Sequence, residues 1–315
     1  MLITALKTHI NKSMNFFKIS MDKYGQPYSC PEIFKLPSTL VLSGGAIKGI
    51  YLLGALHGLC TTAGNTGEHR FKVLVGTSSG AIICFLLSIG YSPFEIYRSL
   101  LNNDNLLTVD YTGIPQSKES EGRVENGRGG IFSSQHIFLH VQKLMKKKKI
   151  HPDLTFKEHN EMTGTVLVVT AFNVTQKKET LFSTLTFPDV PIVEALKLSS
   201  GIPIVFRPLS FNKDMFVDGG VWDNFPIKAG LYILNTLHLS DSILALTTIF
   251  SFYKREICQW YNNKKLILLM VEDTDDWVPT LISTDEDKFY MFLTGFKKGK
   301  VFRQTEKRQR RNTIA

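Results

Sequence analysis

Cysteine is scarce in this chain of 315 residues, and its four cysteines lie far apart. No two of them form the CxxC pair typical of zinc and redox sites, so the spacing suggests neither a zinc site nor a disulfide framework. They are Cys30, Cys60, Cys84 and Cys258. A reducing compartment is the simpler interpretation.

The chain also lacks long apolar segments. Lys7 and Lys12 interrupt its short apolar start, so we expect no secretory signal peptide. Residues 73–94 carry no charged side chain, but a glycine-rich turn at 76–80 divides them into a short strand and a helix. That helix, roughly a dozen residues long, is too short to cross a bilayer and is apolar on all sides, which predicts a buried central helix. We expect a cytoplasmic protein that is not secreted.

Negative charge is rare near the C-terminus. The formal net charge of the chain is +9, and residues 296–315 contain eight Lys or Arg residues against one acid, Glu306. Such a segment can bind anionic lipid headgroups or nucleic acid, act as a nuclear-import signal, or stay solvated. We therefore treat residues 291–315 as a basic C-terminal tail.

Apolar residues make up 43% of the sequence, enough for a sizeable core. Strand-like runs alternate with helix-compatible stretches, which predicts a mainly parallel sheet covered by helices on both faces. We expect a three-layer α/β/α fold in one large domain over residues 37–290, after an N-terminal extension over residues 1–36. Polar residues 102–130 predict a long surface loop, either a flap over a site or a flexible insertion.

The segment Gly76-Thr77-Ser78-Ser79-Gly80 is a GxSxG pattern between an apolar run and a helix-like run. In a nucleophile elbow, a strand enters a tight turn and a helix leaves it, which exposes the serine hydroxyl at the edge of a sheet. Gly76 and Gly80 fit this geometry because side chains at their positions would collide. The pattern makes Ser78 a candidate nucleophile; the alternative is an ordinary glycine-rich turn without chemistry.

The segment Ser43 to Gly49 follows the first expected strand and opens a helix. Backbone N–H groups at Gly44, Gly45 and Ala46 would converge at the positive end of that helix, where they suit a developing oxyanion. A phosphate-binding loop is the alternative. The segment lacks the GxGxxG spacing, and it lacks the Ser or Thr of a P-loop after Lys48.

A base for the serine is harder to find. His238 alone lies beyond the plausible acid in the usual Ser, acid, His order, and an ordinary helix-surface residue is the plainer interpretation of it. His57 also suits a structural role. Asp218 ends a strand-like run before Gly219-Gly220, so its carboxylate can act as base to a serine, or it can cap its own turn.

Together these segments resemble the patatin-like phospholipase family, with the glycine-rich motif at 43–49, the elbow at 76–80 and the aspartate motif at 218–220. Residues 194–203 and 223–226 resemble the segments on either side of the aspartate strand. The resemblance implies a Ser78-Asp218 dyad without histidine, metal or cofactor, and oxyanion donors around Gly45 and Ala46.

The sequence departs from the family where Ala46 replaces a third glycine and Lys48 replaces a common arginine. Alanine keeps its N–H, so the oxyanion hole survives unless a positive φ is needed there. Lysine keeps the charge but loses the planar fork of arginine, which would alter a contact with a lipid headgroup.

The resemblance implies a lipid acyl hydrolase that cleaves phospholipid or other fatty-acyl esters through an acyl-enzyme. We expect peripheral contact with an anionic membrane surface through the basic tail, and no nucleic-acid partner. The alternatives are a membrane-binding protein with little or no activity, and an esterase or triacylglycerol lipase.

Overall fold

The computed structural model describes residues 37–61, 71–101, 125–126, 135–203, 206, 209–248, 266–271 and 284–314. The expected extension, residues 1–36, lies outside the described residues, as does nearly all of the expected loop at 102–130. The side chains of the basic tail from residue 303 onward also lie outside them.

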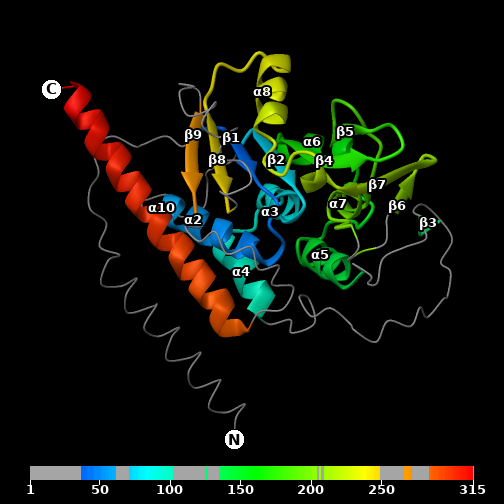
Figure 1. The fold of residues 1–315 in the computed structure, drawn as a ribbon, viewed down its shortest axis with the longest axis horizontal. Helices are drawn as coiled ribbons and strands as arrows, with labels where there is room; N and C mark the ends of the chain where they lie inside the picture. The colour runs from blue at the N-terminus through cyan, green and yellow to red at the C-terminus, as the bar shows by residue number, and fades with distance from the viewer. Residues whose placement is uncertain are drawn as a thin grey trace, which may run out of the picture. The chain divides into compact units, whose positions relative to one another are not determined.

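Five parallel strands form the centre of the sheet, in the order β9-β8-β1-β2-β4 (Figure 1). Every residue of β1, β2 and β8 is buried, because helices cover both faces. This confirms the expected α/β fold with a mainly parallel central sheet. The strands are β1 (Thr39–Leu42), β2 (Val73–Thr77), β4 (Val166–Asn173), β8 (Ile243–Thr247) and β9 (Leu266–Met270).

An antiparallel extension widens the sheet beyond β4. β5 (Lys178–Ser183) folds back along β4, and β7 (Asp214–Asp218) pairs with the last residues of β4. β6 (Leu209–Phe211) and β3 (Glu125–Asn126) continue the sheet outward. Because Ala171 pairs with Asp218, this extension brings the aspartate motif beside the end of β4.

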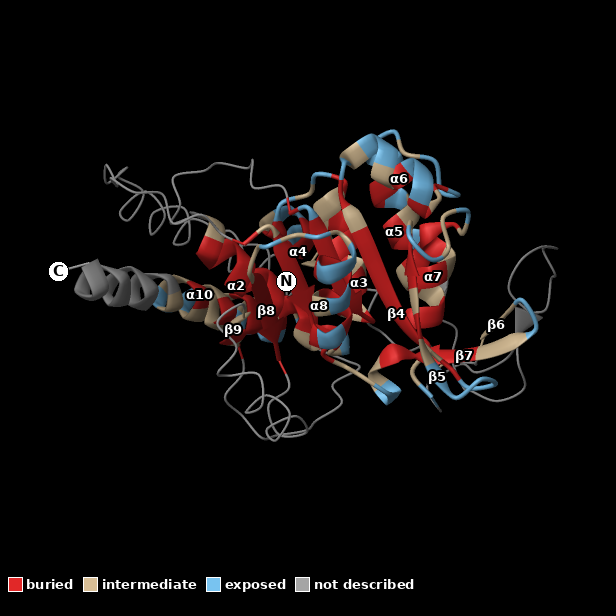
Figure 2. Ribbon diagram, turned by 90° about the horizontal axis from the view of Figure 1, so that it is seen from above, coloured by how far each residue is buried: buried red, intermediate tan, exposed pale blue. Residues whose placement is uncertain are grey.

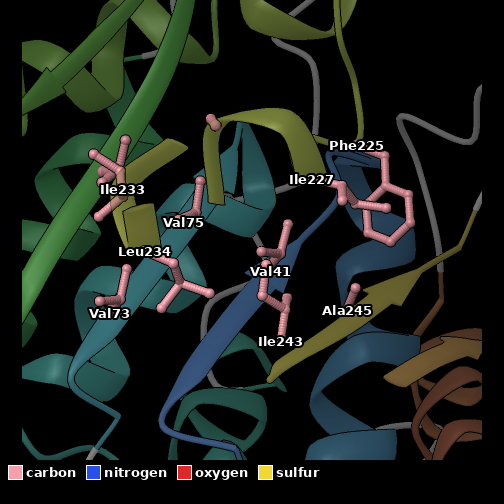
Figure 3. Packing of buried hydrophobic residues seen from close by; sticks show 11 residues of the cluster. Val41, Val73, Val75, Phe225, Ile227, Ile233, Leu234, Ile243 and Ala245 are labelled. Carbon is pink, nitrogen blue, oxygen red and sulfur yellow. The ribbon is translucent and has the colours of Figure 1, made fainter. Parts of the chain in front are cut away.

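Helix α8 (Ile227–Thr236) covers one face of the sheet, and α2 (Gly49–Thr61), α3 (Ser79–Ser88) and α7 (Ile192–Ser199) lie on the other (Figure 1). Figure 3 shows the core beneath α8, where aliphatic side chains of four strands meet Ile233 and Leu234. Figure 2 shows buried central strands and the exposed outer surface of α6. The remaining shorter helices are α4 (Pro93–Leu101), α5 (Gln135–Lys147) and α6 (Phe156–Thr163).

The C-terminal helix α10 (Asp285–Ile314) packs along α2 through small residues. A Cβ atom added at Gly54 or Gly58 would overlap the carbonyl oxygen of Phe292 or Phe296 on α10. Gly295 and Gly299 of α10 stand equally close to backbone oxygens of α2. We call these four glycines the α2-α10 seam.

The expected boundary between residues 290 and 291 falls inside α10, so the beginning of the expected tail is part of this packed helix. Buried Met291 and Phe292 belong to its inner face. Among the described residues, no helix is both long enough and apolar enough to span a membrane.

Candidate active site

Ser78 stands between the end of β2 and the start of α3, at φ 53° and ψ −123°. Positive φ is uncommon for a residue with a side chain and marks a strained turn. Only 5% of Ser78 is exposed. A Cβ atom added at Gly76 would lie 2.5 Å from the amide nitrogen of Ala81, and one at Gly80 would lie 2.5 Å from the Ser43 carbonyl oxygen. The two elbow glycines therefore permit close approach of the backbone.

The end of α7 holds the backbone on both sides of the site. The Ser78 N–H donates to the hydroxyl oxygen of the fully buried Ser199 at 2.8 Å. The Asp218 N–H donates to the Gly201 carbonyl oxygen at 2.9 Å. The sequence marked this segment by its small residues but gave Ser199 no role, because its partner lies 121 residues away.

Asp218 lies at the end of β7, and its Oδ1 accepts the Gly220 N–H at 2.7 Å. The Ser78 hydroxyl lies close enough to the carboxylate to lower its pKa. Burial nevertheless raises the pKa of Asp218 to about 6, against the effects of Ser78 and Gly220. Asp218 therefore caps its own turn, and its carboxylate also lies beside Ser78.

The glycine-rich loop after β1 passes directly beside Ser78. A Cβ atom added at Gly44 would lie 3.3 Å from the Ser78 Cβ and would overlap the side-chain oxygen of Asn224. The Gly44 N–H donates to the Asn224 carbonyl oxygen at 2.9 Å, and Asn224 Nδ2 donates back to the Gly44 carbonyl oxygen at 3.2 Å. Asn224 therefore fixes this loop, a role that the sequence did not reveal.

The backbone N–H groups of Gly45 and Ala46 differ from that of Gly44 in their hydrogen bonding. Within the described part of the chain, neither N–H donates to another backbone group. Ala46 is exposed at a φ of 46°, so this alanine takes the backbone conformation that favours glycine. Lys48 is half-buried in the following turn, where its N–H donates to the Gly45 carbonyl oxygen at 2.8 Å.

His238 lies far from Ser78 in the fold. It follows α8, a helix of ten residues that starts beside the site and ends near the beginning of β8. At that opposite edge of the sheet, Asp241 Oδ2 accepts the Ser38 N–H at 2.8 Å, just before β1 starts. Because the helix is about 15 Å long, the structure does not bring His238 to the serine.

His57 also stands away from the serine. Its ring packs against the rings of Phe94, Phe292 and Phe296, and burial lowers its pKa to about 4. Across the described residues, the side-chain hydrogen bonds of Ser78 and Asp218 involve no histidine. The same residues contain no group of three or more His, Cys, Asp or Glu side chains suited to a metal ion.

Comparisons with known proteins show which family this chain resembles. The family model described as patatin-like phospholipase matches residues 40–231. A probable lipid hydrolase of Invertebrate iridescent virus 6 is 46% identical over 303 residues, which are 96% of this chain and all of the viral protein.

More distant relatives share less. Triacylglycerol lipase 4 of Saccharomyces cerevisiae is 27% identical over 64% of this chain and 23% of the yeast protein. Among solved structures, VipD from Legionella pneumophila is similar with a TM-score of 0.49 and 15% identity, over 85% of this chain and 66% of VipD.

Proposed function

This chain belongs to the patatin-like phospholipase family, and on that basis we propose that it hydrolyses fatty-acyl esters of lipids with Ser78 as nucleophile and Asp218 as base. The observation that carries the proposal is the placement of the Ser78 hydroxyl beside the buried Asp218 carboxylate, close enough to lower the pKa of Asp218. A base with a pKa of about 6 is ionised at neutral pH yet basic enough to accept a proton during attack.

The reaction starts when Asp218 accepts the Ser78 proton and the serine oxygen attacks the ester carbonyl carbon. The tetrahedral intermediate collapses to an acyl-enzyme, and the leaving alcohol takes the proton from Asp218. Asp218 then accepts a proton from water, and the resulting nucleophile attacks the acyl-enzyme. The fatty acid leaves and the proton returns to Ser78, so no proton is gained or lost by the enzyme.

The glycine-rich loop supplies the oxyanion donors in this proposal. The amides of Gly45 and Ala46 are its candidates, because their N–H groups make no backbone hydrogen bond among the described residues. The Gly44 N–H already serves Asn224, so Gly44 contributes close approach to Ser78. Loss of one such donor typically slows acyl transfer by roughly 100- to 1000-fold.

The proposed substrate class rests on the names of the relatives and on the positive charge of Lys48 and the basic tail. We propose phospholipids as substrates, with Lys48 near the headgroup and the basic tail against an anionic membrane surface. Neutral lipid is the second candidate, because relatives in yeast are named triacylglycerol lipases. Hydrolysis of phospholipid vesicles compared with triacylglycerol emulsions separates the two.

The dyad is tested by Ser78→Ala and Asp218→Asn, with Ser79→Ala as the matched control in the same turn. We expect each dyad variant to lose more than about 1000-fold in fatty-acid release, as for other removed nucleophiles, and to stay folded. Ser79→Ala should retain hydrolysis. Substantial activity in either dyad variant overturns the assignment, and an equal loss in His238→Ala restores a histidine triad.

A further inference from the structure

Two large apolar side chains stand exposed directly beyond the proposed base. Val221 and Trp222 follow Asp218-Gly219-Gly220 and are 52% and 60% exposed. The Trp222 ring stacks on Phe172 of β4, with 5.5 Å between centroids and 8° between planes. One face of the indole is therefore held in place while much of the side chain faces solvent.

Exposed lysines lie along the same antiparallel part of the sheet as these two residues. Lys228 in the first turn of α8 lies close enough to Glu179 to affect its pKa, and Glu179 is paired across the ribbon with Phe172, the residue under Trp222. Lys178 starts β5 beside Glu179 and is exposed.

Two neighbouring turns add Lys177 and Lys213, both exposed. The turns pack together because Asp214 accepts hydrogen bonds from the side chains of Asn173 and Gln176. We call Val221, Trp222 and the four lysines at 177, 178, 213 and 228 the edge patch.

The acidic groups at this edge are less exposed than the lysines. Glu179, Asp214 and Asp223 are all half-buried, and Asp214 is already hydrogen-bonded to two side-chain amides. Burial raises the pKa of Glu179 to about 7, which leaves part of its population neutral. The charge offered to solvent around Trp222 is therefore positive.

A cavity of about 740 Å³ opens between β5, β7 and α8, and Lys178 and Lys228 belong to its lining. Its walls also carry aromatic rings, among them Phe187, Phe211 and Tyr232. The edge patch thus combines two protruding apolar groups, which closely follow Asp218 in the chain, with cationic side chains, two of which line an apolar cavity.

We propose that the edge patch seats on an anionic lipid bilayer, with Val221 and Trp222 among the headgroups and the lysines against phosphate. This inference rests on the proposed function, and it assigns the surface through which lipid reaches the site. Exposed apolar side chains next to a site that acts on lipid are typical of a membrane contact. Tryptophan favours the membrane interface, and each nearby lysine adds on the order of fivefold in binding to anionic lipid.

The test measures binding of the full chain to vesicles of phosphatidylcholine with and without an equal part of phosphatidylglycerol, by co-sedimentation. Trp222→Ala should weaken binding to the anionic vesicles by about tenfold or more, from the apolar area withdrawn from the interface. Tyr290→Ala is the matched control, because Tyr290 is an aromatic residue 65% exposed on α10 and away from this edge. It should bind as wild type does.

Two further variants keep the test independent of the Trp222-Phe172 stack. Val221→Ser should weaken binding severalfold, and Lys178→Ala with Lys228→Ala should weaken it by roughly 25-fold in a salt-dependent manner. Wild-type binding by all three variants overturns the edge patch and leaves the basic tail as the contact.

Failure of the edge patch and failure of the proposed function give different results. Ser78→Ala should bind vesicles as wild type does, and Trp222→Ala should still cleave a monomeric short-chain ester. If wild type binds through the edge patch but releases no fatty acid, the hydrolase proposal is wrong and the membrane surface stands. If Trp222→Ala, Val221→Ser and the double lysine variant all bind and hydrolyse vesicles normally, the surface is wrong and the hydrolase stands.

Discussion

The candidate active site, which lies at the edge of the sheet where β1 and β2 end and is called the edge below, and the α2-α10 seam both depend on glycine. The two regions differ in backbone strain. In the seam, Gly54 and Gly295 lie in regular helices, and the absence of side chains lets two backbones touch. At the edge, Gly44 also permits close approach, yet the positive φ angles fall on Ser78 and Ala46, which carry side chains. The difference suggests that packing in the seam stabilises the fold, whereas backbone strain at the edge destabilises it.

Both regions bury polar groups, and at the seam the buried Tyr97 hydroxyl has no hydrogen-bond partner among the described residues. At the edge, Asp218 is buried as an acid with a raised pKa, and the buried hydroxyl of Ser79 has no hydrogen-bond partner among the described residues. The seam is bordered by stacked rings, such as those of Tyr97 and Phe292 at 4.1 Å between centroids. Helix α2 begins directly after the glycine-rich loop. Its unstrained packing against α10 in the seam therefore holds the helix from which the strained loop extends.

The largest effect on stability is expected from Gly295→Leu in the seam. The new side chain would overlap the Tyr51 carbonyl oxygen and separate α10 from α2. Overpacking of a well-packed contact costs about 3 kcal/mol or more, which corresponds to a Tm lower by roughly 5–10 °C for a domain of this size. Thermal unfolding followed by circular dichroism measures the change.

The matched control for the seam is Val301→Ala, on the same helix but 59% exposed. It should change stability by less than about 0.5 kcal/mol, as surface substitutions generally do. If Gly295→Leu unfolds at the wild-type temperature, close packing of the two helices does not stabilise the protein, and the contrast with the edge is lost.

The next effect concerns Asp218→Asn and depends on pH. The folded-state pKa of about 6 lies above the ordinary aspartate value of 3.8, so the folded protein binds more protons between these two values. Wild-type stability attributable to this group therefore falls as pH rises from about 4 to 6 and stays lower above that. We expect Asp218→Asn to be more stable than wild type at pH 8 by on the order of 3 kcal/mol, and equally stable near pH 4.

Catalytic activity should also depend on the ionisation of Asp218. Because the base must be ionised, wild-type kcat/KM should rise with pH through about 6, while Asp218→Asn stays inactive throughout. Chemical unfolding at several pH values gives the stability difference. Equal stability of the two proteins at pH 8 would show that the buried carboxylate carries no cost.

Local pattern was enough to predict the centre of the fold. β1 and β2 are short apolar runs that end at glycine-rich turns, and the division of residues 73–94 into β2 and α3 is confirmed. The antiparallel strands β5 and β6 were missed, because their residues alternate polar and apolar over a few positions only. β8 was missed although it is entirely buried, because its apolar run Ile243–Thr247 adjoins another apolar stretch.

The order of the three motifs indicated the site, but its internal contacts did not follow from sequence. Ser199 meets Ser78, and Asn224 meets Gly44 across 180 residues, so no local period marks either contact. Helix α10 was also missed, since Gly295 and Gly299 weaken a helix by themselves and are favourable only against α2. The roles of Ser78, Asp218 and the oxyanion loop stay predictions that the kinetic tests address.

The smallest effect is expected from Ala46→Gly, which probes strain at the edge without removing a hydrogen-bond donor. A side chain at positive φ destabilises the folded state by about 1 kcal/mol, and Ala46→Gly removes this strain. Glycine also gives the unfolded chain more conformational freedom, which offsets part of the stabilisation. The net result should be a stabilisation of about 0.5 kcal/mol, with fatty-acid release within about twofold of wild type because the N–H at position 46 is kept. A large loss of activity would mean that the methyl group shapes the site, and a loss of stability would mean that the φ of 46° is no burden here. A loss of stability would place the backbone strain of the edge on Ser78 alone.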